Sequence, residues 1–64
     1  MTKAQYSKAV ARAAQYGSAK LDEGCTLHCY RRDYDGTHEW SVRDENDNCI
    51  TVVADPFSLK YMYN

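Results

Sequence analysis

The sequence predicts a single α+β domain in which an N-terminal helix packs on a three-stranded antiparallel meander, an αβββ order. Two patterns favour this fold class. Residues 2–21 carry small and apolar side chains at helical spacing, whereas residues 25–54 alternate apolar and polar side chains between turn-forming stretches. A chain of 64 residues has room for one core, so we expect residues 1–64 to form one domain.

The helix is expected over residues 2–21. Thr2 and Gln5 have the spacing of a capping box, in which each side chain accepts a hydrogen bond from the other residue's free backbone N–H. One stripe at near-helical spacing carries Tyr6, Val10, Ala13, Gly17 and Leu21. The small residues in this stripe would let the helix lie close to a sheet, and Gly24 suits a stop just after the last turn.

Three strands are expected over residues 25–31, 38–43 and 49–54. Asp35-Gly36 marks the first hairpin turn, and residues 44–48 are rich in Asp and Asn, which suits a second turn. Alternation assigns to the helix-facing side Cys25, Leu27, Cys29, Trp40, Val42, Ile50 and Val52. It assigns to the outer face Thr26, His28, Tyr30, Glu39, Ser41, Arg43, Cys49, Thr51 and Val53.

The C-terminal segment has two interpretations. Asp55 and Pro56 end the third strand, and the same pair suits the start of a short helix over residues 57–62. An extended tail or a fourth strand is the alternative.

Composition limits the classes of protein. The chain has no run of about 18 apolar residues that would span a membrane, and its first residues lack the apolar stretch of a secretory signal. Its three cysteines, an odd number, then indicate reduced thiols and a cytoplasmic setting. Leu, Ile, Val and Phe make only nine of the 64 residues, so Tyr and Trp must supply much of the core. A core this thin leaves open a homodimer or a structural subunit of a larger complex.

No catalytic or metal-binding motif is evident. The residue types that bind zinc are present: Cys25, His28, Cys29, His38 and Cys49. Their expected faces separate them, whereas a structural zinc site needs four converging ligands. Residues 44–55 begin like a calcium loop but lack its Gly and its final Glu. No cysteine sits in a motif with a base and an orienting acid. We therefore expect no cofactor, no metal and no enzymatic activity.

Charge is divided along the chain. Residues 1–21 contain four Lys and Arg and no acid, whereas residues 22–64 contain all nine acids and four Lys and Arg. A meander brings the loop before the first strand and the second turn to the same end of the sheet, which would gather Asp22, Glu23, Asp44, Glu45 and Asp47. The opposite end would carry Asp33, Tyr34 and Asp35.

These side chains favour a small protein-binding inhibitor or adaptor that contacts a basic protein surface, with exposed tyrosines such as Tyr34 and Tyr61 as anchors. In size, expected fold and acidic loops, the chain resembles small proteins encoded by phages and other mobile elements, including anti-CRISPR inhibitors. That resemblance implies a nucleic-acid-binding protein of host defence, such as a CRISPR effector, as the partner. The alternative is a nucleic-acid-binding module that uses the basic helix face and the outer sheet face, with Lys8, Arg12, Tyr30 and Arg43.

Overall fold

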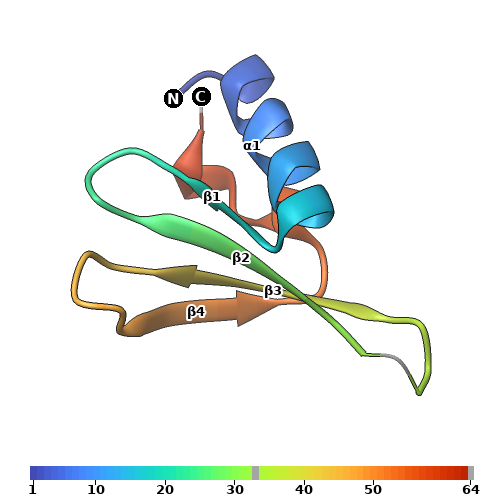
Figure 1. The fold of residues 1–64 in the computed structure, drawn as a ribbon. Coiled ribbons are helices and arrows are strands. Elements are labelled where there is room, and N and C mark those ends of the chain that lie inside the picture. The colour runs from blue at the N-terminus through green and yellow to red at the C-terminus, as the bar shows by residue number, and fades with distance from the viewer. Residues whose placement is uncertain (33, 64) are drawn as a thin grey trace.

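The computed structural model describes residues 1–32 and 34–63, and it has the expected α+β architecture (Figure 1). Helix α1 spans Lys3–Tyr16. The strands are β1 (Ser18–Lys20), β2 (Thr26–Arg31), β3 (His38–Arg43) and β4 (Cys49–Val53). They form one antiparallel sheet in the order β1-β2-β3-β4, so the described chain has four strands rather than the three expected. Two short 3-10 helices follow, η1 (Pro56–Ser58) and η2 (Lys60–Met62).

Helix α1 begins at the predicted cap and ends earlier than expected. The Gln5 N–H donates to Thr2 Oγ1 at 3.2 Å, and the Thr2 N–H donates to Gln5 Oε1 at 2.8 Å. The expected extension to residue 21 is wrong, because Gly17 takes a left-handed conformation (φ 96°) and its N–H bonds the Ala13 carbonyl at 2.8 Å. A Cβ on Gly17 would meet nothing within 4 Å, so this glycine is needed for its backbone angle and not for close packing.

The residues after Gly17 form the additional strand. β1 pairs with β2, with Ser18 opposite His28 and Ala19 opposite Leu27. The side chains of Ala19 and Leu21 are buried in the core. Leu21 is therefore buried, as its place on the predicted apolar stripe suggested. It follows strand β1, however, and does not belong to the helix.

The core lies between α1, the sheet and the C-terminal segment. Its buried members are Tyr6, Ala9, Ala13, Ala19, Leu21, Leu27, Trp40, Val42 and Leu59. The inward faces predicted for β2 and β3 are thus confirmed for Leu27, Trp40 and Val42. The described residues contain no helix that is both long and apolar enough to cross a membrane.

The faces predicted for β4 are wrong beyond its first residue, because a β-bulge shifts the register. Arg43 lies opposite Cys49, whereas Val42 lies opposite Thr51, so Ile50 is an extra residue in β4. Every later side chain of β4 then turns to the other face. Val53 packs against the core, whereas Val52 is 50% exposed and Ile50 is 53% exposed.

The C-terminal segment closes the core as two short 3-10 turns, which replace the single short helix or the tail that was expected. Asp55 caps the first turn, since its Oδ1 accepts the Phe57 N–H at 3.0 Å. Tyr6 of α1 stacks on Tyr63 at 4.8 Å between ring centroids and meets Phe57 edge-on at 5.7 Å. The Tyr6 hydroxyl also donates to the Pro56 carbonyl at 2.6 Å. These contacts bind the last residues of the chain to its first helix.

Candidate functional site

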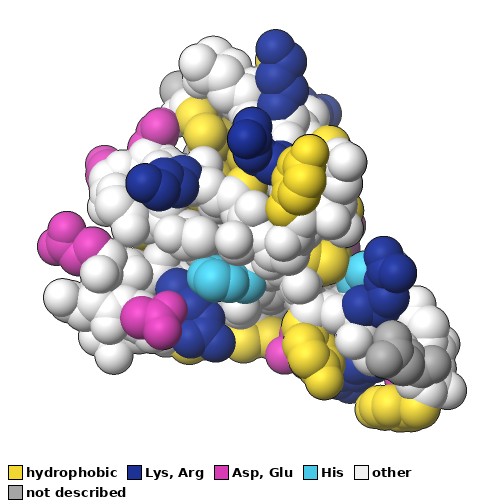
Figure 2. Space-filling view, in the orientation of Figure 1, with side chains coloured by type: hydrophobic (Ala, Val, Ile, Leu, Met, Phe, Trp, Pro, Cys, Tyr) yellow, Lys and Arg dark blue, Asp and Glu magenta, His cyan; other side chains and the backbone are white. Residues whose placement is uncertain are grey.

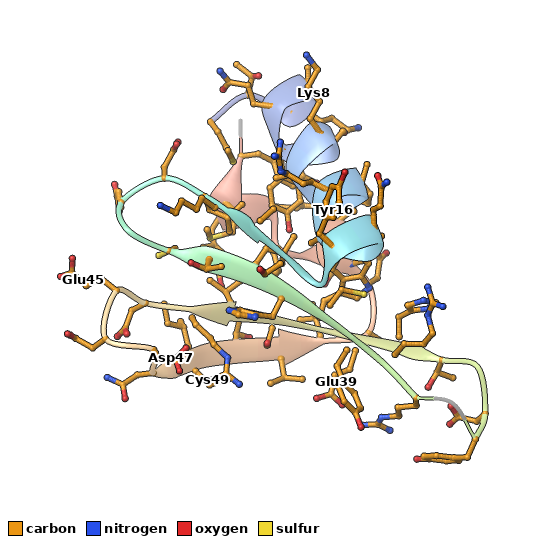
Figure 3. All side chains as sticks on the ribbon, viewed as in Figure 1. Lys8, Tyr16, Glu39, Glu45, Asp47 and Cys49 are labelled. Atoms are coloured by element: carbon orange, nitrogen blue, oxygen red, sulfur yellow. The ribbon has the colours of Figure 1, made fainter. Side chains whose placement is uncertain are left out.

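Two turns lie against each other at one end of the sheet, as the meander predicts. A Cβ added to Gly24, in the β1–β2 turn, would lie 3.2 Å from the Cβ of Glu45, in the β3–β4 turn. Figure 3 shows Glu45 and Asp47 at this end, and Figure 2 shows acidic side chains concentrated along the same edge of the molecule. We use the name acidic rim for the five predicted acids that these turns carry: Asp22, Glu23, Asp44, Glu45 and Asp47.

Part of the charge of the acidic rim is neutralised within the fold. The Asp22 carboxylate pairs with the α-amino group of Met1 at 2.7 Å. The Asp47 carboxylate pairs with Arg43 at 3.4 Å, and its own side chain is 78% exposed. The Arg43–Asp47 pair is exposed and contributes little stability, because water screens it. The two pairs do place two positive charges beside the five carboxylates.

Asp44 has a structural role in its turn. Its Oδ1 accepts the backbone N–H groups of Asn46 and Asn48, both at 2.9 Å. Asp47 holds a left-handed backbone with φ 63°, a conformation that Asp tolerates. The acids of this turn therefore fix its shape, which keeps Glu45 next to the β1–β2 turn.

A pocket of about 320 Å³ adjoins the acidic rim. Asp22 and Glu23 line it together with Ile50 and Tyr61. The Tyr61 side chain is 66% exposed, so the structure places one of the expected tyrosine anchors beside the acids. Tyr63 differs, since its ring packs on Tyr6 in the core region.

The opposite end of the sheet is the tip of the β2–β3 hairpin, which projects beyond the rest of the molecule in Figure 1. Of the predicted residues there, Asp33 lies outside the described residues, and Tyr34 is 83% exposed. The Asp35 carboxylate accepts hydrogen bonds from the Thr37 N–H at 3.0 Å and the Thr37 hydroxyl at 2.8 Å. These bonds lower the pKa of Asp35. Asp35 therefore stabilises the hairpin turn and lies at the end of the sheet opposite the acidic rim.

At the base of this tip, Arg32 pairs with Glu39 across the hairpin. The charge of the Glu39 carboxylate raises the pKa of the Arg32 guanidinium. The positive charge of Arg32 and the negative charge of Glu39 thus neutralise each other at the base of the hairpin tip.

The four residues of the nucleic-acid alternative fall on two surfaces. Lys8 and Arg12 line a groove between α1 and β1, and Lys20 lines the same groove. Tyr30, which is 66% exposed, and Arg43 lie towards opposite ends of the β2–β3 ladder. Sequence reasoning missed Lys20 because it placed this residue on the helix, whereas it belongs to β1.

The three cysteines are free and differ in exposure. Cys49 is exposed, whereas Cys25 and Cys29 are partly buried, and burial raises the pKa of the Cys29 thiol. Within residues 1–32 and 34–63, no three side chains of His, Cys, Asp and Glu gather as a group that could hold a metal ion.

Comparisons of this chain with protein-family models, curated proteins and solved structures gave no match.

Proposed function

We propose that this chain is a small protein-binding inhibitor or adaptor without catalytic activity, which presents the acidic rim and the adjoining pocket lined by Tyr61 to a basic protein surface. The observation that carries the proposal is the close approach of Gly24 to Glu45, which leaves little room for a side chain at Gly24. It brings together two turns that are separate in the sequence and that carry five carboxylates. Two of these acids, Asp22 and Glu23, line a pocket with the exposed Tyr61.

The charge of the acidic rim would steer the encounter with the partner. Its five carboxylates face two paired cations, the Met1 amino group and Arg43, so an excess of three negative charges remains. Complementary charge mainly raises the rate of association and fixes orientation, over a range of about 8–10 Å at moderate salt. This excess lies on Glu23, Asp44 and Glu45, because none of the three forms an ion pair in the described part of the chain. Asp44 also holds the shape of its turn, so Glu23 and Glu45 are the two acids to change in a test.

The pocket beside the acidic rim would supply binding energy. Tyr61 and Ile50 are both more than half exposed, and both line this pocket. Stable interfaces commonly combine an aromatic anchor near their centre with a polar periphery. The partner should therefore present an apolar side chain within a positively charged surface.

The resemblance to phage-encoded inhibitors suggests which basic surface this would be. A nucleic-acid-binding protein of host defence, such as a CRISPR effector, has a positively charged groove for phosphates. The carboxylates of the acidic rim would occupy that groove in place of phosphates. We assign this interaction to the cytoplasm, because three free thiols suit a reducing compartment.

Affinity capture from source cells, followed by binding measurements on the identified partner, tests the proposal. The Glu23→Gln/Glu45→Gln double variant should slow association and flatten its salt dependence. Tyr61→Ala should speed dissociation and weaken binding at least tenfold, as expected for an anchor residue. Glu39→Gln is the matched control, because it removes one carboxylate away from the acidic rim and keeps a hydrogen-bond acceptor for Arg32. Binding that is unchanged in the rim and Tyr61 variants would contradict the proposal.

A further inference from the structure

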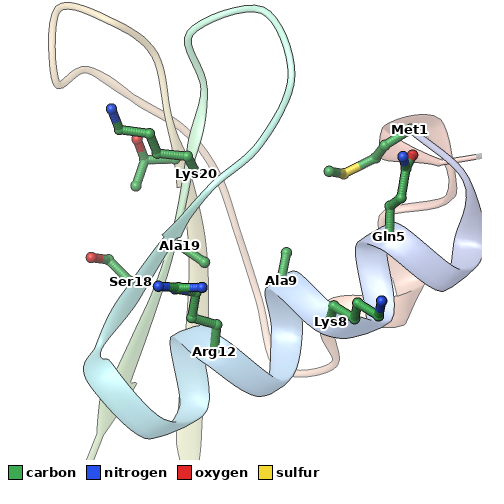
Figure 4. Close-up of a pocket in the computed structure, with 9 residues that line it drawn as sticks. Met1, Gln5, Lys8, Ala9, Arg12, Ser18, Ala19 and Lys20 are labelled. Atoms are coloured by element: carbon green, nitrogen blue, oxygen red, sulfur yellow. The ribbon is translucent and has the colours of Figure 1, made fainter.

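We propose that the groove between α1 and β1 binds single-stranded nucleic acid, with the phosphodiester backbone held by Lys8, Arg12 and Lys20. This site uses none of the residues of the acidic rim, so it stands apart from the proposed protein-binding function. The groove has a volume of about 600 Å³. Figure 4 shows the side chains that line it.

The local fold explains why the three cations line one groove. Lys8 and Arg12 are four residues apart on α1, which makes them neighbours on one helix face. The left-handed turn at Gly17 then reverses the chain, and β1 places Lys20 at the edge of the groove, on the face of the strand opposite to the buried Ala19. The small side chains of Ala9 and Ala19 leave space between helix and strand, as Figure 4 shows.

The electrostatics of the groove favour an anion with several charges. Among the residues that line it, three are Lys or Arg and none is Asp or Glu. In residues 1–32 and 34–63, none of these three cations forms an ion pair. Asp22 lies nearby but pairs with the amino group of Met1 at 2.7 Å, so it offsets that charge first. Several Lys and Arg side chains along one groove raise the local positive potential, which a row of phosphates would neutralise.

An exposed aromatic ring beside the groove favours nucleic acid over other polyanions. The Tyr16 side chain, on the last turn of α1, is 70% exposed. The Arg12 guanidinium carbon lies 5.9 Å from the centre of the Tyr16 ring. Proteins that bind single strands combine cations for the backbone with aromatic side chains on which bases stack. A duplex keeps its bases paired inside and would leave Tyr16 unused, and an acidic peptide has no bases to stack. Lys8 and Tyr16 are marked on α1 in Figure 3.

Fluorescence anisotropy with a labelled oligothymidine, titrated at several salt concentrations, tests the proposal. Three neutralised phosphates predict a slope of log K against log salt of about −2, so affinity should fall roughly twentyfold between 50 and 200 mM salt. The triple variant Lys8→Gln/Arg12→Gln/Lys20→Gln should lose most of the binding and its salt dependence. A matched control removes three exposed cations outside the groove, by the substitutions Lys3→Gln, Arg31→Gln and Lys60→Gln, and should bind almost as well as the unsubstituted protein.

Tyr16→Ala tests the stacking step separately. It should weaken binding at least fivefold while the salt slope stays unchanged, because it removes a base contact and no charge. Tyr16 is mostly exposed, so the variant should keep its fold, which circular dichroism can verify.

Three results would overturn the proposal: no binding of the oligonucleotide at 50 mM salt, equal losses in the groove and control triple variants, or equal binding of a duplex or of polyglutamate. Failure of this test leaves the protein-binding proposal standing, because the acidic rim and Tyr61 remain intact in all these variants.

Discussion

Replacing Tyr6 with phenylalanine tests how the C-terminal segment is held on the helix. The Tyr6 side chain is fully buried, and its hydroxyl donates to the Pro56 carbonyl at 2.6 Å. Tyr6→Phe keeps the ring contacts but leaves that buried carbonyl without its partner, which costs about 1–3 kcal/mol. A domain of this size has a total stability of roughly 3–10 kcal/mol, so the loss is substantial. At about 4–8 °C per kcal/mol, Tm should fall by roughly 10 °C.

The pH dependence gives this prediction a second readout. Burial, with a smaller contribution from Tyr63, raises the pKa of Tyr6 to about 12. The unfolded chain titrates this hydroxyl near pH 10, so the stabilisation is complete below pH 10 and is lost as the pH rises from 10 to 12. Two pH units correspond to about 3 kcal/mol. Tyr6→Phe has no proton to lose at this position, so its stability should approach that of the unsubstituted protein as the pH rises above 10.

Urea unfolding followed by the fluorescence of Trp40, which is buried, measures both effects between pH 8 and pH 11. Tyr61→Phe is the control, because the side chain of Tyr61 is 66% exposed and the change should cost less than about 0.5 kcal/mol. A stability difference between Tyr6→Phe and the unsubstituted protein that stays constant across this pH range would contradict the proposed role of the Tyr6 hydroxyl, as would an equal loss of stability in the control.

Three further predictions test the fold and the thiols. Val42→Ala should cost about 2–3 kcal/mol in urea unfolding and Val52→Ala less than about 1 kcal/mol, since Val42 is buried and Val52 is half exposed; equal losses would refute the bulge in β4. Gly17→Ala should cost about 1–2 kcal/mol because of its left-handed backbone, and Gly17→Asn less; an unchanged Tm for Gly17→Ala would contradict this cap. Iodoacetamide at pH 8 should modify Cys49 before Cys29, because Cys49 is exposed and burial raises the pKa of Cys29; peptide mass mapping showing the reverse order would exclude this assignment.

Elements with a strong local signal could be predicted from the sequence. The capping box of Thr2 and Gln5 marks the start of α1, and alternation around Leu27 and Trp40 gives the inward faces of β2 and β3. β1 could not be predicted in this way, because a strand of three residues exists only through its pairing with β2. The sequence did contain one indication of the helix end, which is Gly17. A glycine at this position fits either a left-handed cap that ends the helix or a small residue in a packed helical stripe.

The remaining errors have non-local causes. The single extra residue in β4 reverses the faces that follow it, and nothing in the alternation of Ile50 and Val52 indicates where such a residue falls. The approach of the two acidic turns, by contrast, could be predicted, because the strand order of a meander places both turns at the same end of the sheet. The pairing of Asp22 with the Met1 amino group depends on how the chain start lies over the folded domain. Lys20 could not be placed in the groove from the sequence, because it belongs to β1, the strand that was not predicted.

The hydrogen bond between Tyr6 and Pro56 joins groups 50 residues apart in the sequence. A ribosome adds about 5–20 residues per second, so the two partners are synthesised roughly 3–10 s apart. During that interval the first helix has been synthesised, whereas the C-terminal residues that pack on Tyr6 have not. This part of the core, which includes one of the largest buried side chains, can therefore form only after residues 56–63 have been added.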